Sequence, residues 1–179
     1  MRYETKLIIR ILIALSIFII PYSLITKIFL KATIAVVYFL SSFSYSPIIN
    51  HNSIIIDNKI LDFIPACIAT SAYLLFYLLI LLTKDINLKK MIYIALIGSL
   101  IIFILNIIRI EILISVFLNY GLNLFNKIHF IFWSLISTTF VAIVWIFLSY
   151  KFKIKEIPLY SDIKYLLKKS KKRKKLKSR

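Results

Sequence analysis

The chain has 179 residues, of which 61% are hydrophobic and only 17% are charged, and its mean hydropathy is +0.91. These values lie far above those of a soluble domain and exclude an ordinary water-soluble protein. They indicate an all-α membrane protein of one domain, because each bilayer crossing needs a helix of about 20 apolar residues.

The net charge of +17 is concentrated at the carboxyl end. Residues 151–179 contain thirteen Lys or Arg and two acids, and they directly follow the last apolar run. A basic segment in this place marks the cytoplasmic side of a membrane and binds anionic lipid head groups. We therefore divide the chain into a membrane domain, 1–150, and a polybasic cytoplasmic tail, 151–179. We expect no nucleic-acid partner, since no recognition fold accompanies the charge.

Two apolar runs open the chain. Residues 7–24 follow a basic start with Arg2 and Lys6, which favours a cytoplasmic amino terminus, and the run lacks a small-residue cleavage site, so it is expected to be an uncleaved span. The second run, 28–43, has about 16 residues and reaches roughly 24 Å as a helix, short of a hydrocarbon core of about 30 Å. It is predicted to be a half-inserted or surface helix, with a full crossing as the alternative.

A polar stretch, 44–65, separates these runs from the next span. Within it, aliphatic residues at 54–56 and 60–61 flank the tripeptide Asp57-Asn58-Lys59. Apolar residues around an Asp-Asn tip are typical of a β-hairpin. A small hairpin is therefore predicted on the outer face, just before Cys67.

Two spans follow the hairpin. The run 66–83 ends in a short loop, 84–90, whose basic excess places it in the cytoplasm, so Cys67 at the other end of this span is expected outside. The run 91–108 then returns outward and brings Arg109 to the same face.

The last part of the membrane domain contains one more span. Residues 110–126 are too polar for a crossing and are predicted to form an outer loop with a surface helix. The run 130–149 then leads inward to the tail, with His129 at its outer start. This gives four crossings and two cytoplasmic termini, whereas five crossings would put the basic amino terminus outside.

Three side chains that could take part in catalysis are thus expected on the outer face. Cys67 is the only cysteine, and a nearby cation or imidazole raises the fraction of nucleophilic thiolate. Arg109 offers a fork of donors to a thiolate or an oxyanion, and His129 can take the thiol proton and return it to a leaving amine. Asn106, three residues before Arg109, shares its helix face and is a candidate for substrate binding or for orienting the guanidinium.

Each of these residues also has a structural interpretation. Cys67 could be a small packing residue, His129 an interfacial anchor, and Arg109 a side chain that extends to the head groups. Their occurrence on one face favours a site.

The other polar residues are weaker candidates. His51 lies in the polar loop, where a solvated role is expected, and either Asp62 or Glu111 could orient His129. Two histidines and scattered acids give no metal-ligand spacing, so neither a metal nor a cofactor is predicted.

Three stretches stand out: Ile64-Pro65-Ala66-Cys67 before a span, Asn106-Ile107-Ile108-Arg109-Ile110 at the end of the next, and Ile128-His129-Phe130 at the start of the last. Together they resemble the exosortase and archaeosortase family of multi-pass membrane cysteine transpeptidases. The run from Cys67 to Tyr73 is more similar to archaeal members. The order of segments from 23 to 150 is also similar.

The resemblance implies that Cys67 is the nucleophile and that Arg109 and His129 are its catalytic partners. It implies exported protein substrates that end in a short motif, a transmembrane helix and a basic cluster. Cleavage outside the membrane would leave an acyl-enzyme, from which the acyl group is transferred to a lipid or another acceptor.

The chain departs from the family pattern directly after the cysteine. Ile68 and Ala69 stand where a Ser or Thr and then a Gly are usual.

The alternative function is a non-catalytic membrane scaffold or assembly factor that acts through its basic tail, and a third option is a small transporter subunit.

Overall fold

The computed structural model describes residues 3–19, 22–64, 67–84, 86–132, 137–154, 156–158 and 160–177. These residues form helices α1 (Tyr3–Ile19), α2 (Tyr22–Ser41), α3 (Thr70–Leu82), α4 (Leu88–Ile131), α5 (Ser137–Lys151) and α6 (Tyr160–Lys177), and strands β1 (Ile48–Asn50), β2 (Ser53–Ile56) and β3 (Lys59–Asp62). The mostly helical architecture with one small sheet agrees with the predicted fold class.

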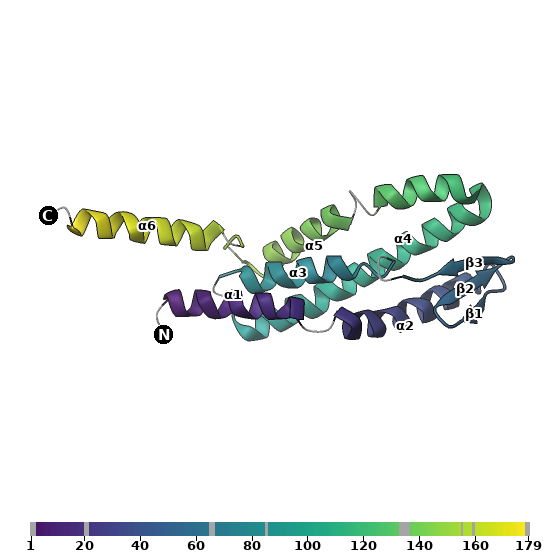
Figure 1. Cartoon of the computed structure of the whole chain (residues 1–179), viewed down its shortest axis with the longest axis horizontal. Helices are drawn as coiled ribbons and strands as arrows, with labels where there is room; N and C mark the ends of the chain where they lie inside the picture. The colour runs from purple at the N-terminus through teal and green to yellow at the C-terminus, as the bar shows by residue number, and fades with distance from the viewer. Residues whose placement is uncertain are drawn as a thin grey trace.

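The molecule is elongated, and its two ends differ in structure (Figure 1). Helices α1, α3 and α5 lie with the amino-terminal part of α4 in one half, whereas α2 and the sheet lie beside a later part of α4 in the other half. Both termini lie at the end away from the sheet, where α6 extends beyond the bundle.

The core of the helical half forms around α3, which packs against α1, α4 and α5. The Phe76 ring of α3 is fully buried and faces Gly98 of α4, where an added Cβ would overlap the ring. Trp145 of α5 approaches the same ring edge-on, with the ring centroids 6.4 Å apart. A glycine at position 98 therefore permits the close approach of α3 and α4.

A second core joins the sheet to the helices. It contains buried aliphatic residues of α2, β2 and α4, among them Val37, Ile54, Ile56 and Ile110. Because successive side chains of a strand point to opposite faces, Ile54 and Ile56 lie on the same face, and this face is buried. The sheet is thereby held against α2 and the middle of α4.

The three strands form an antiparallel meander in the order β1-β2-β3. Asp57 and Asn58 both have positive φ, 50° and 60°, which a two-residue type I′ hairpin turn requires. Ile56 pairs with Lys59 on either side of this turn. The predicted hairpin is confirmed, and β1 adds a third strand through the turn at His51 and Asn52.

Helix α4 continues well beyond the predicted end of its span. Residues 110–126, predicted to form an outer loop with a surface helix, belong instead to a helix that runs to Ile131 with a break at Gly121. There φ is 79° and ψ is −177°, a combination that is essentially restricted to glycine. The loop prediction was wrong because Asn119 and Asn123, which suggested a loop, occupy exposed helix positions.

The boundaries of the other predicted spans also change. The run 7–24 is divided between α1 and α2, and α2 has 20 residues instead of 16. Helix α3 begins at Thr70, not at residue 66, which lies outside the described residues. His129 lies in the last turn of α4, not at the start of the final span, and α5 begins only at Ser137.

One helix in the described part of the chain, α4, is long and apolar enough to cross a membrane. Its most apolar stretch has a mean hydropathy of 2.7, and only 28% of this stretch is buried. Helices α3 and α5, with 13 and 15 residues, reach roughly 20 and 22 Å. Among the described residues, the four predicted crossings are therefore not reproduced by helix length.

The carboxy-terminal helix is attached to the end of the bundle that carries the amino terminus. Arg10 of α1 forms an ion pair with the buried Asp162 of α6, with Nη2 and Oδ1 2.7 Å apart. The Lys84 ammonium lies 5.3 Å from the centre of the Tyr165 ring. The predicted cytoplasmic loop, 84–90, and the basic tail thus meet at the same end.

Candidate active site

Cys67 lies in a tight turn between β3 and α3. Its amide donates to the carbonyl of Ile64 at 2.9 Å, and its side chain is half-buried. Two residues later, Ala69 adopts the left-handed conformation, with φ 55° and ψ 36°, and α3 begins at the next residue. The turn thus leads directly from the sheet into α3.

Two buried side chains of α4 hold this turn. Asn106 Nδ2 and Arg109 Nη2 donate to the carbonyl oxygen of Cys67 at 3.0 and 3.2 Å. Both residues are only 5% exposed. The structure therefore gives both residues a direct contact with the cysteine backbone.

The break at Gly121 brings His129 to the same place. After the break at Gly121 the chain turns back along the molecule (Figure 1). The last turns of α4 therefore lie alongside the stretch of the helix that precedes the break. The His129 ring packs against Phe125, with the ring centroids 5.4 Å apart and the planes tilted by 40°. His129 lies in the last turn of α4 and lines the same cavity as Arg109.

Cys67, Arg109 and His129 line one cavity of about 320 Å³. Its other walls are mostly apolar and come from β3 and the residues after it, from α4 before the break, and from α4 after the break: Ile60, Leu61, Asp62, Phe63, Ile64, Ile110, Leu113, Ile114, Phe117, Leu122 and Phe125. The cavity is of the size found for small-ligand and peptide side-chain sites. A thiol, a guanidinium and an imidazole thus converge in a largely apolar space.

The acids proposed to orient His129 are engaged elsewhere or lie apart. The Asp62 carboxylate accepts a hydrogen bond from Ser53 Oγ at 2.5 Å, across the β2–β3 ladder. Glu111 does not line the cavity. Among the described residues, neither acid forms a hydrogen bond with His129. His51, the other histidine, is exposed in the β1–β2 turn and is not part of the cavity wall.

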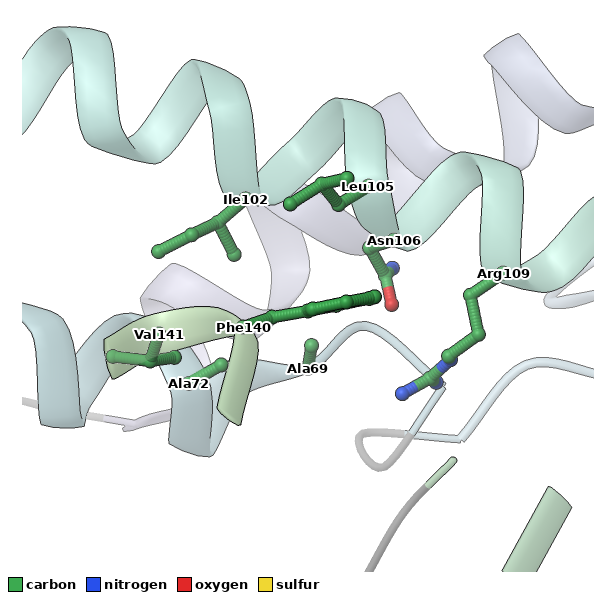
Figure 2. A pocket seen from close by; sticks show the side chains of 8 residues that line it. All are labelled: Ala69, Ala72, Ile102, Leu105, Asn106, Arg109, Phe140 and Val141. Carbon is green, nitrogen blue, oxygen red and sulfur yellow. The ribbon is translucent and has the colours of Figure 1, made fainter. Parts of the chain in front are cut away.

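A second, smaller cavity of about 30 Å³ lies behind the cysteine turn. Figure 2 shows Asn106 and Arg109 extending from α4 toward the turn, with the Phe140 ring of α5 between Ile102 and Ala69. The Oδ1 atom of Asn106 is buried without a hydrogen-bond partner in the described part of the chain. A cavity of this size can hold one water molecule, which would satisfy that oxygen.

Lys59 of the hairpin contacts α4 next to the break, and the sequence did not predict this contact. Its ammonium donates to the carbonyl of Leu118 at 3.1 Å and lies 3.5 Å from that of Phe117. In a continuous helix these carbonyls would accept from amides four residues later, but Gly121 breaks the helix there. The Lys59 ammonium therefore caps the segment of α4 that ends at Gly121. A positive charge is favourable there because the carboxyl end of a helix dipole is negative.

No protein-family model matches the chain, and no curated protein or solved structure matches it significantly. Function is therefore inferred from the residues of the chain itself.

Proposed function

We propose that the chain is a multi-pass membrane cysteine transpeptidase similar to the exosortases and archaeosortases. The observation that carries this proposal is the convergence of Cys67, Arg109 and His129, from three distant parts of the chain, on one cavity. These are the residues to which the family resemblance assigns the nucleophile and its two partners.

The chemistry is an acyl transfer in two steps. In the first step the Cys67 sulfur attacks a peptide carbonyl, so that a C–S bond forms and the C–N bond breaks, while His129 moves the thiol proton to the leaving amine. The guanidinium of Arg109 stabilises the negative charge on sulfur and on the oxyanion. In the second step an acceptor hydroxyl, amine or water attacks the thioester, the C–S bond breaks, and the thiol is restored.

The exposed surface of α4 supports a membrane location. Apolar side chains at four-residue intervals form a continuous exposed stripe along this helix: Ile92, Leu96, Leu100, Ile104, Ile108 and Ile112. The stripe extends over roughly 30 Å, the thickness of a bilayer's hydrocarbon core. Lipid contact accounts for such an unpartnered surface, whereas the core helix of a soluble protein is mostly buried.

The distribution of charge supports one orientation. Lys84 contacts Tyr165 of the basic helix α6, and Lys89 and Lys90 lie in the first turn of α4 at the same end of the bundle (Figure 1). The cavity lies toward the sheet at the other end, because residues of β3 line it. By the positive-inside rule the basic end and both termini are cytoplasmic, and Cys67 opens to the outer face. In this proposal the shorter apolar helices α1, α3 and α5, which pack together beside α4, enter the membrane with it.

The substrates in this proposal are exported proteins with a carboxy-terminal motif, a transmembrane helix and a basic cluster. A substrate helix beside α4 would place its preceding segment at the cavity. A membrane lipid is the natural acceptor for an acyl-enzyme at this surface.

The test uses co-expression with an exported protein from the same genome that carries such a carboxy-terminal signal. Wild-type protein is expected to shorten this substrate, and hydroxylamine is expected to release it from the enzyme as a hydroxamate. Cys67→Ala should abolish both products. The two histidines provide a matched pair, since His129→Ala should reduce processing by about 100-fold and His51→Ala should leave it unchanged.

Undiminished processing by Cys67→Ala would end the proposal. Failure of a membrane-impermeant maleimide to label Cys67 from outside the cell would instead favour the scaffold function.

A further inference from the structure

The edge of β3 next to the cavity is not paired with another strand. Strand β3 is at one edge of the three-stranded sheet, and β2 is its only neighbour among the described residues. Five consecutive residues, 60–64, line the cavity. A cavity above one face of a strand would contact alternate residues, so this one lies along the strand's edge.

The hydrogen-bond register shows which backbone groups this edge offers. Because a two-residue turn closes the hairpin, Lys59 forms a hydrogen-bonded pair with Ile56, and Ile60 is then in a non-hydrogen-bonded pair. The amide of Phe63 donates to the Asn52 carbonyl at 3.0 Å, which continues the same alternation. The amides and carbonyls of Ile60 and Asp62 therefore point away from β2.

The thiol lies on this same edge. Cys67 Sγ is 4.0 Å from the Asp62 carbonyl oxygen, to which the thiol donates. The amide and carbonyl of Ile60 and the amide of Asp62 have no backbone partner within the described part of the chain. A strand that paired with these groups would place its own backbone next to the sulfur.

We propose that the site binds its substrate as an extended peptide that adds a fourth strand to β3 along Ile60 and Asp62. This inference rests on the proposed function and defines its substrate segment: an unfolded, extended stretch on the amino side of the cleaved bond. Backbone hydrogen bonds to the edge hold the peptide, as in other cases of strand addition. Its side chains that face α4 are apolar, because Phe117, Leu122 and Phe125 form the opposite wall.

The test measures alkylation of Cys67, the only cysteine, in the purified full chain. The peptide probe is N-acetyl-Val-Phe-Val chloromethyl ketone, whose methylene carbon bonds to sulfur as chloride leaves and the thiol proton is lost to water. Iodoacetamide, which has no peptide backbone to pair, reports the intrinsic reactivity of the thiol. Mass spectrometry gives both rates.

A matched pair of variants separates the two edges of the sheet. Ile60→Pro removes an outward-pointing amide of β3 without removing a bond to β2, and Ile49→Pro does the same on β1, at the opposite edge. Ile60→Pro should slow the peptide probe by about tenfold and leave the iodoacetamide rate unchanged. Ile49→Pro should change neither rate.

Methylation of the probe provides a second measurement on the wild-type protein. Strand pairing uses alternate amides, so methylation of one of two adjacent probe amides should slow labelling by about tenfold and methylation of the other should not.

Equal effects of both methylations, or a peptide rate unchanged in Ile60→Pro, would overturn strand addition and leave the proposed function standing. A Cys67 that reacts with neither reagent would overturn the proposed function as well. Dimers that Ile60→Pro converts to monomers would show that a second copy of the chain occupies the edge instead.

Discussion

The backbone conformation of Ala69, two residues after the candidate nucleophile, leads to a quantitative prediction. Ala69 has φ 55°, a left-handed conformation that costs a residue with a Cβ about 1–2 kcal/mol. The exosortases and archaeosortases, which the sequence resembles, usually have a glycine at this position. Ala72, in the first turn of α3, has an ordinary helical backbone and nearly the same exposure, 7% against 8%.

Glycine substitutions at these two positions should therefore have different effects. Each removes one buried methyl group, which costs about 0.8 kcal/mol, and each adds the same freedom to the unfolded chain. Ala69→Gly also relieves the left-handed strain of about 1–2 kcal/mol, whereas Ala72→Gly has no such strain to relieve. The variants should therefore differ in stability by about 1–2 kcal/mol, with Ala69→Gly the more stable.

Thermal unfolding in detergent, followed by dye fluorescence or circular dichroism, measures this difference. For a chain of this size, 1 kcal/mol corresponds to about 2–4 °C, so the midpoints should be separated by about 2–8 °C. Equal midpoints, or a lower midpoint for Ala69→Gly, would refute the argument that position 69 carries backbone strain.

Two further substitutions test how the cavity is assembled. Gly121→Ala places a Cβ in open space but on a backbone with φ 79°, so it should lower the stability by about 1–3 kcal/mol and displace His129. A lower unfolding midpoint and slower alkylation of the Cys67 thiol would be observed. Unchanged values for both would show that the break tolerates a side chain. Lys59→Met keeps the length of the side chain but removes the cap on the Phe117 and Leu118 carbonyls, so it should lower the stability by about 1 kcal/mol. Lys59→Arg keeps a positive charge and should retain part of this stabilisation. A midpoint for Lys59→Met equal to the wild-type value would show that the cap contributes nothing.

Local signals in the sequence predicted the features that depend on neighbouring residues. The Asp57-Asn58 pair indicated the hairpin because both residues tolerate positive φ, and the structure shows this turn. The same kind of reasoning was wrong for residues 110–126, where asparagines on the exposed side of a helix were interpreted as a loop. Polarity alone does not distinguish a solvated helix face from an irregular segment.

The sequence by itself determined that the chain is strongly apolar and basic, and it singled out Cys67, Arg109 and His129 as candidates. Only the tertiary structure decided how these residues meet. Arg109 reaches the Cys67 carbonyl across the α3–α4 interface, and His129 reaches the cavity because α4 reverses at Gly121. Hydropathy and turn propensity depend on residues close in the chain, whereas these contacts depend on how distant segments pack, which no local pattern encodes.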